Sequence, residues 1–287
     1  MPRQNTAFLA FNRGIVSRLG LARADLKRVA MSAQEQKNWI PRVLGSMMLR
    51  PGLGYLGTSK NNAAAKYIPF VFSITSKALC EMTDQAMRVW VGDALITRAS
   101  VSSAVTNGNF DSNLTGWTNA DEAGATSAWQ TGGYMGLTGN GTSAAYRHQT
   151  VTVGAADQGV EHALRVVIER GPVIFRVGTA AGDDSYVRET TLDTGEHSLA
   201  FTPTGNFSIQ FLSRLARIVL VDSCNVEAAG VMSVPTPWIA NDLDQLRWDQ
   251  SGDVIFVAAD GYQQWKVERR SATSWSSSDL RAPRCGS

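Results

Sequence analysis

The chain has 287 residues, of which 44% are hydrophobic and 18% are charged, and this composition excludes a disordered chain. Its apolar runs fall far short of the roughly 20 residues that a membrane-spanning helix needs, so we expect a soluble protein with no membrane-spanning segment. The net charge of +2 hides an asymmetry, because residues 1–104 carry 14 Lys and Arg against 5 Asp and Glu, whereas residues 105–230 carry 7 against 13. Length and charge together predict two differently charged domains.

Neither the N-terminus nor the cysteines indicate secretion. The first residues include arginines but no apolar run leading to a small-residue cleavage site, so we expect no secretion signal. The cysteines, Cys80, Cys224 and Cys285, are widely spaced and odd in number. This argues against a disulfide framework and against paired-cysteine metal sites, and it predicts reduced thiols.

The first predicted element is an amphipathic helix from Ala22 to the residue before Pro41. Apolar residues recur there at steps of three or four, and a residue that precedes proline is disfavoured in a helix. Its basic face and the cations before it would meet acidic neighbours or transiting DNA, and a solvated face is the alternative. These basic residues are Arg13, Arg18, Arg23, Lys27 and Arg28.

Short β-like runs follow the turn at residues 50–52, and a similar block lies near the C-terminus. The first block covers residues 67–74, 78–82, 86–91 and 94–97, and the second covers residues 253–258 and 263–268. Each block contains a strand, a turn with Asp and a strand with Trp, namely Trp90 and Trp265. Such repetition is typical of propeller blades, and chance similarity of two hairpins is the alternative.

Residues 105–230 have a different character, with short alternating strands separated by Gly, Thr, Ser and Asn. This rhythm predicts an antiparallel β-sandwich, or jelly roll, of about eight strands. We therefore expect a mainly β protein in which residues 1–104 and 231–287 form a β-rich domain, with its N-terminal helix, that the sandwich interrupts. The predicted strands are residues 134–138, 146–153, 162–169, 173–177, 186–192, 196–201, 207–212 and 218–221.

No catalytic signature is present in the sequence. It lacks the Ser, metalloprotease, phosphate-loop and dinucleotide motifs, so we expect no enzyme activity and no required cofactor. A polysaccharide depolymerase would need a positioned pair of carboxylates, and no pair stands out. His148, His162 and His197 fall in predicted strands without short mutual spacing, so we interpret them as surface or partly buried residues.

The two ends of the predicted sandwich resemble carbohydrate-binding jelly rolls of the galactose-binding-like class. Residues 106–117 (TNGNFDSNLTGW) resemble the opening strand of that class, and residues 218–226 (IVLVDSCNV) resemble its closing strand. In many modules of that class the first and last strands hold a structural calcium ion, and the resemblance implies Asp222, together with Asn109 or Asp111, as its ligands here. Sugar recognition needs an aromatic platform, and the candidate rings are Trp129, Tyr134, Tyr146 and Tyr186, whereas Trp117 is expected in the core.

Outside residues 105–230 the chain resembles a family of bacteriophage tail structural proteins that includes nozzle, or tail tubular, proteins and tail-tip components. The motifs that carry this resemblance occur in the family's order on both sides of the predicted sandwich. They are residues 11–17 (FNRGIVS), 23–26 (RADL), 38–42 (NWIPR), 50–52 (RPG), 68–72 (IPFVF), 81–89 (EMTDQAMRV), 236–238 (TPW), 242–243 (DL), 246–247 (LR), 249–254 (DQSGDV) and 274–275 (SW).

The tail resemblance implies a structural virion protein, made in the host bacterial cytoplasm, that forms a homo-oligomeric ring with other tail proteins at the tail end. The alternative is an adhesion module whose sandwich binds a host cell-surface polysaccharide. This chain departs from the family in ending with a polar segment, residues 276–287, so either a partner completes its sheet or the chain is a shortened form.

Overall fold

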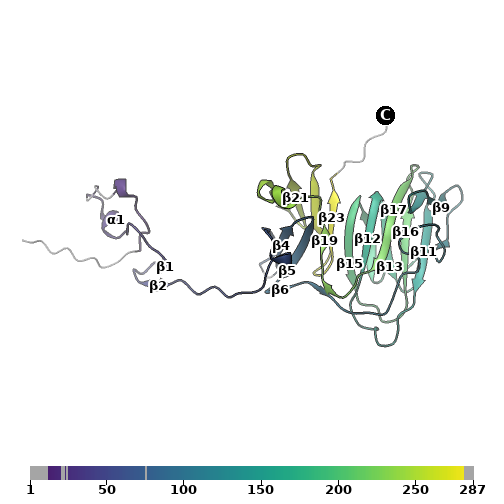
Figure 1. The fold of residues 1–287 in the computed structure, drawn as a ribbon, viewed down its shortest axis with the longest axis horizontal. Coiled ribbons are helices and arrows are strands. Elements are labelled where there is room, and N and C mark those ends of the chain that lie inside the picture. Colours follow the sequence, from purple (N-terminus) through teal and green to yellow (C-terminus); the bar gives the residue numbers. More distant parts are fainter. Residues whose placement is uncertain (1–11, 21–22, 24, 75, 281–287) are drawn as a thin grey trace, which may run out of the picture. The chain divides into compact units, whose positions relative to one another are not determined.

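The computed structural model describes residues 12–20, 23, 25–74 and 76–280, and these divide into two compact units (Figure 1). The N-terminal unit is Met1–Leu56 and the C-terminal unit is Gly57–Ser287. The described part of the chain is mainly β, as predicted, with several antiparallel sheets. No helix in the described residues is long and apolar enough to cross a membrane.

The N-terminal unit holds only short elements: the 3-10 helix η1 (Arg18–Gly20), the helix α1 (Lys27–Ala30) and the hairpin of β1 (Trp39–Pro41) and β2 (Met47–Leu49). The prediction of a helix from Ala22, itself outside the described residues, to Pro41 is therefore wrong in its length. A helix gains most of its stability from packing an apolar face, and no described residue of this unit is buried. Ala33 instead forms a bridge with Ile15, and Asn38 adopts a left-handed conformation with a φ of 60°.

The C-terminal unit is built around a nine-stranded antiparallel sheet that joins strands from distant parts of the sequence. Five of its strands come from residues 105–230 and the other four lie C-terminal to them. In spatial order they are β20 (Arg247–Ser251), β21 (Val254–Ala258), β22 (Trp265–Arg269), β23 (Trp275–Asp279), β15 (Gly195–Phe201), β12 (His162–Arg170), β17 (Val219–Val226), β10 (Tyr134–Thr138) and β9 (Thr126–Gln130).

A five-stranded sheet packs against the β15 to β9 part of the large sheet and forms the predicted sandwich. Its order is β14 (Val187–Leu192), β13 (Val173–Gly178), β16 (Phe207–Ser213), β11 (Ala145–Val151) and β8 (Thr118–Asn119). The core between the two sheets is apolar and includes Phe110, Leu164, Phe175 and Phe211. All eight strands predicted between residues 134 and 221 are present within a few residues of their expected bounds, because alternating apolar residues face this core.

Another sheet packs on the β20 to β23 part of the nine-stranded sheet, and a separate core, here called the second core, lies between them. This other sheet contains β3 (Lys66–Val71), β4 (Lys77–Thr83), β5 (Ala86–Val91), β6 (Ala94–Leu95) and β19 (Val234–Pro235), and the 3-10 helices η2 (Lys60–Asn62) and η3 (Ala240–Gln245) accompany it. Phe70 meets Trp275 edge to face, with 5.2 Å between ring centroids. Both predicted hairpins are present as β4–β5 and β21–β22, while a propeller-like arrangement of further blades stays a prediction.

The two cores lie on opposite faces of the nine-stranded sheet. Trp275 of β23 belongs to the second core and pairs with Ser198 of β15. The next residue, Ser276, points to the opposite face of the sheet and pairs with His197. His197 lies on the same face as Leu199, which belongs to the sandwich core. The polar segment at residues 276–287 was not expected to contain a strand, yet Ser276–Asp279 are buried in β23 between β22 and β15. On one side β23 therefore pairs with β15 of the predicted sandwich, and completion of the sheet by a partner stays a prediction.

The chain enters and leaves residues 105–230 through two paired strands, β7 (Thr97–Arg98) and β18 (Gly230–Val231). The amide of Met232 donates to the carbonyl of Ile96 at 2.9 Å. Buried members of the sandwich core come from residues 110–224, and those of the second core come from residues 68–96 and 232–275. The predicted division at 104/105 and 230/231 stays a prediction, because one continuous sheet links both cores.

Candidate functional site

Tyr146 lies on the outer face of the five-stranded sheet and is held there by its neighbours. Ala145 and Val151 of the same strand point into the core, so the alternation of side chains places Tyr146 on the opposite face. The hydroxyl of Tyr146 donates to Oε1 of Gln210 at 2.7 Å, and Nε of Arg176 donates to the same oxygen at 2.9 Å. The Arg176 guanidinium carbon lies 5.9 Å from the centroid of the Tyr146 ring, within cation–π range.

The loop between β13 and β14 covers Gln210 and makes it a fixed anchor. Nε2 of Gln210 donates to the carbonyls of Ala180 and Asp183, and the amide of Gly182 donates to Oε1. Asp183 stiffens the loop by accepting hydrogen bonds from Ser185 and Thr179, which hold the pKa of its carboxyl well below the usual range. These contacts bury Gln210 fully. Its Oε1 therefore holds the Tyr146 hydroxyl in one position before any ligand binds.

His148 and Glu189 add polar groups to the same face. The His148 ring lies 5.5 Å from that of Tyr146, and its Nδ1 is buried without a hydrogen-bond partner. Burial lowers the pKa of His148, so the imidazole is neutral at pH 7. Glu189 forms an ion pair with Arg176 at 3.1 Å. A half-buried aromatic ring, a neutral imidazole and an ion pair can recognise a neutral, hydroxyl-rich ligand. We call Tyr146, His148, Arg176, Glu189 and Gln210 the Tyr146 face.

The other three candidate aromatic residues lie elsewhere. Trp129 packs against the sandwich core and its Nε1 donates to the carbonyl of Phe110 at 2.6 Å. Tyr186 also packs against this core, with its ring stacked 5.9 Å from that of Phe201. Tyr134 precedes the buried Met135 and therefore projects from the outer face of the nine-stranded sheet. The four rings do not form one platform, and a sugar-binding role for each stays a prediction.

The opening and closing segments of the sandwich lie side by side, as the jelly-roll resemblance implies. The amide of Cys224 donates to the carbonyl of Gly108 at 2.7 Å, and Nδ2 of Asn225 donates to Oδ1 of Asn109 at 2.7 Å. Among the described residues, however, no three His, Cys, Asp or Glu side chains gather as metal ligands. A calcium site at Asn109, Asp111 and Asp222 stays a prediction.

The five basic residues predicted to meet DNA or acidic neighbours all lie exposed in the N-terminal unit. Arg23 is engaged by Asp25 in a two-pronged ion pair at 2.9 Å. Lys27 and Arg28 lie in α1, Arg18 lies in η1, and Arg13 precedes the bridge at Ile15. Their exposure leaves them accessible, and their partners stay a prediction.

Two of the three histidines are more buried than expected. His197 is fully buried, with Nδ1 2.8 Å from Oγ of Ser276 and Nε2 2.9 Å from the carbonyl of Asp193. His162 is 1% exposed and contacts Oγ of Ser103 through Nε2. The prediction of surface or partly buried histidines holds only for His148, because the other two lie where the sandwich meets neighbouring strands and segments.

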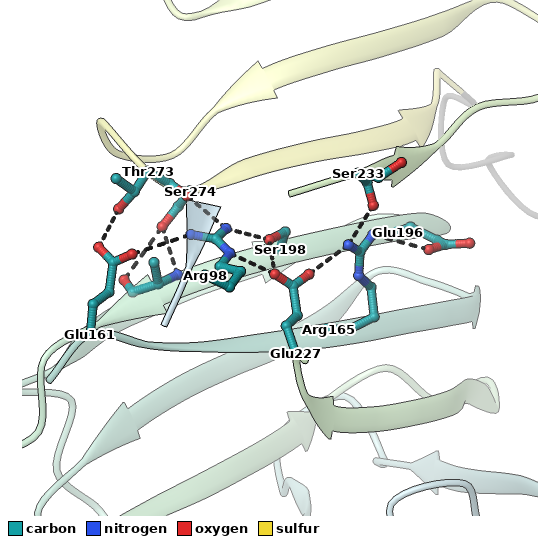
Figure 2. A network of polar contacts seen from close by, with 10 residues as sticks. Arg98, Glu161, Arg165, Glu196, Ser198, Glu227, Ser233, Thr273 and Ser274 are labelled. Atoms are coloured by element: carbon teal, nitrogen blue, oxygen red, sulfur yellow. Dashed lines mark hydrogen bonds and ion pairs between the residues drawn. The ribbon is translucent and has the colours of Figure 1, made fainter. Parts of the chain in front are cut away.

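Sequence reasoning missed a buried polar network where the chain enters and leaves the sandwich (Figure 2). Nε of Arg98 donates to Oε2 of Glu227 at 2.6 Å, and these side chains are only 3% and 7% exposed. Arg165 forms an ion pair with Oε1 of Glu227 at 2.6 Å and donates to the carbonyl of Ser233. Arg98 also donates to Oγ of Ser198 and to the carbonyl of Thr273.

The network connects segments rather than presenting a reactive group. Arg98 precedes the sandwich, Glu227 follows β17, Ser198 lies in β15 and Thr273 precedes β23. Glu161 closes one end, accepting from Oγ1 of Thr273 at 2.8 Å. Because its central pair, Arg98 and Glu227, is buried and links both parts, we interpret the network as the connection between the sandwich and the C-terminal strands. In the sequence, Arg98 stands shortly before residues 105–230 and Glu227 stands near their end, and neither position indicates that the two side chains meet.

Comparison with known proteins leaves the family open. No protein-family model matches the chain, and no curated protein matches it either. Among solved structures, a family 11 carbohydrate-binding module from Clostridium thermocellum, in complex with a β-1,3-1,4-mixed-linked tetrasaccharide, aligns over 47% of this chain and 100% of its own length with 13% identity. The TM-score is 0.28, too low to carry an argument about function. The resemblance to tail proteins stays a prediction from sequence motifs.

Proposed function

We propose that this chain is a non-enzymatic glycan-binding protein whose binding surface is the Tyr146 face. The observation that supports this best is the anchoring of Tyr146 by the buried Gln210, which fixes the ring before any ligand arrives. A ring that is already ordered loses little conformational entropy on binding, so more of the contact energy appears as affinity.

The chemistry of the face suits a neutral sugar. A pyranose presents an apolar face that can lie on an aromatic ring, and its hydroxyls both donate and accept hydrogen bonds. The carboxylate of Glu189, which is 46% exposed, can accept hydrogen bonds from those hydroxyls. The charge of Glu189 is balanced by Arg176, which suits hydroxyl binding better than the nucleophilic role of a glycosidase carboxylate.

Affinity electrophoresis tests the proposal, with mixed-linkage β-glucan, bacterial O-antigen polysaccharide and capsular polysaccharide each cast into native gels. We expect at least one polysaccharide to retard the wild-type chain, and Tyr146→Ala to weaken that binding about tenfold, corresponding to about 1.4 kcal/mol. Trp248→Ala is the matched control, because Trp248 is an exposed aromatic residue of β20, away from the Tyr146 face and outside the set of candidate rings. Equal retardation of the Tyr146 variant and the wild type would contradict the proposed site.

A second function, structural scaffolding in a bacteriophage tail, is favoured by how the tail-like motifs meet. The amide of Gln85 donates to the carbonyl of Trp238 at 2.8 Å, and the amide of Ala240 donates to Oδ1 of Asp84 at 2.9 Å. Residues 81–89 and 236–238, far apart in sequence, thus form one local structure. Mass spectrometry of gradient-purified phage particles tests this role: the chain should be present in the tail fraction, and its absence from intact particles would contradict it.

A further inference from the structure

The N-terminal unit exposes large apolar side chains and buries none of its described residues. Leu19, Val43 and Leu44 are each at least 93% exposed, and Leu53 and Tyr55 are 85% and 80% exposed. Soluble units rarely leave so much apolar surface uncovered unless it meets a partner. The N-terminal unit therefore needs a surface to pack against.

The secondary structure of this unit is also too short to persist alone. The helix α1 has four residues, and the β1–β2 hairpin has three residues in each strand. Isolated helices of this length and isolated two-stranded hairpins are marginal at best in water. Residues 51–59, which follow, contain neither helix nor strand, so they can act as a tether.

The C-terminal unit offers a matching apolar surface at the edge strand β3. Tyr67, Val71, Phe72 and Ile74 are between 47% and 91% exposed. Strand addition is disfavoured at this edge, because Pro69 lacks an amide hydrogen and the Gln250 side chain already bonds the amide and carbonyl of Val71. Contact through side chains is the remaining mode. We call these four residues the β3 surface.

Charge favours a second copy of this chain as the partner. Residues 1–56 carry 9 Lys and Arg against 2 Asp and Glu, whereas residues 57–287 carry 18 against 23. The two acids of the N-terminal unit already pair with its own Arg23 and Lys37. One copy's cationic unit is therefore complementary to the anionic unit of another. The exposed apolar side chains favour this protein contact over nucleic acid.

We propose that the N-terminal unit of one copy packs on the β3 surface of a second copy. Different patches meet in such a contact, so it can close into a dimer by mutual exchange or into a ring. The apolar side chains of both surfaces become covered. The N-terminal unit then folds on the β3 surface of the neighbouring copy.

Light scattering of the full-length chain over a range of micromolar concentrations tests this contact. We expect a wild-type oligomer that dissociates as salt is raised. Two variants should each weaken self-association about tenfold or more. They are Val43→Glu/Leu44→Glu in the N-terminal unit and Ile74→Glu in the β3 surface. Leu215→Glu, at a 37% exposed position in the sandwich, is the control and should associate like the wild type.

Mixing the two weakened variants gives the sharpest readout. The Ile74→Glu chain keeps an intact N-terminal unit, and the Val43→Glu/Leu44→Glu chain keeps an intact β3 surface. The mixture should therefore form heterodimers when neither variant associates alone. A mixture that stays monomeric would overturn the contact between the N-terminal unit and the β3 surface. A wild-type chain that is monomeric throughout, or that associates only with nucleic acid, would also overturn it.

Discussion

Glu227 forms ion pairs with two arginines of the polar network, Arg98 and Arg165, so one carboxylate stabilises two positive charges. Removing it in Glu227→Ala would leave Arg98, which is 3% exposed, without its main counterion. We expect this variant to lose about 3–5 kcal/mol of unfolding free energy, the usual cost of breaking a buried pair. Urea denaturation measures the loss. Glu189→Ala, which removes a 46% exposed partner of Arg176, should cost about 1 kcal/mol or less, and equal losses would contradict the difference in burial.

His197 should make the protein less stable in mild acid. Burial lowers the pKa of His197 to about 3 in the folded chain, whereas an exposed histidine in the unfolded chain titrates near 6.5. The unfolded state therefore binds the proton first. The contribution of the neutral ring is complete above pH 6.5 and is lost progressively as the pH falls toward 3, by about 1.4 kcal/mol per pH unit. His197→Gln should flatten the decline between about pH 7 and 5 in urea titrations, and an unchanged slope would refute this role.

At the scale of elements, the contact between β15 and β23 depends on Gly195. This residue has a φ of +140°, and a Cβ added there would lie 2.3 Å from the carbonyl oxygen of Ser277. We expect Gly195→Ala to lower the unfolding free energy by several kcal/mol and to reduce hydrogen-exchange protection selectively in β23. Gly205→Ala is the matched control, since its added Cβ would meet nothing within 4 Å. Unaltered exchange in β23 would contradict the close approach.

At the scale of the whole molecule, the shared nine-stranded sheet predicts that both cores of the C-terminal unit unfold together. Leu164→Ala in the sandwich core and Ile255→Ala in the second core each remove a fully buried side chain. Each should destabilise one common transition by about 2–5 kcal/mol, measured by calorimetry and by urea with tryptophan fluorescence. Two separate transitions, each moved by only one variant, would show instead that the cores are independent.

Much of the fold was predictable because side chains in a strand alternate between its two faces, and this alternation can be read in the sequence. Leu164, Val166 and Ile168 alternate with Arg165, and this pattern predicts both a strand and its buried face without knowledge of its neighbours. The aromatic candidate Tyr146 could be named in the same way. Its partner Gln210 could not, because an amide in a strand gives no sign that a loop 30 residues earlier will cover it.

The sequence by itself determined the mainly β class, the strands of the sandwich and the two hairpins, since these depend on local alternation and turns. Only the tertiary structure decided that Ser276–Asp279 form a buried strand, that Arg98 and Glu227 meet, and that Tyr146 stands apart from Trp129, Tyr134 and Tyr186. The physical reason is that alternation reports the two faces of one strand, whereas strand neighbours and buried ion pairs depend on contacts between residues far apart in the chain.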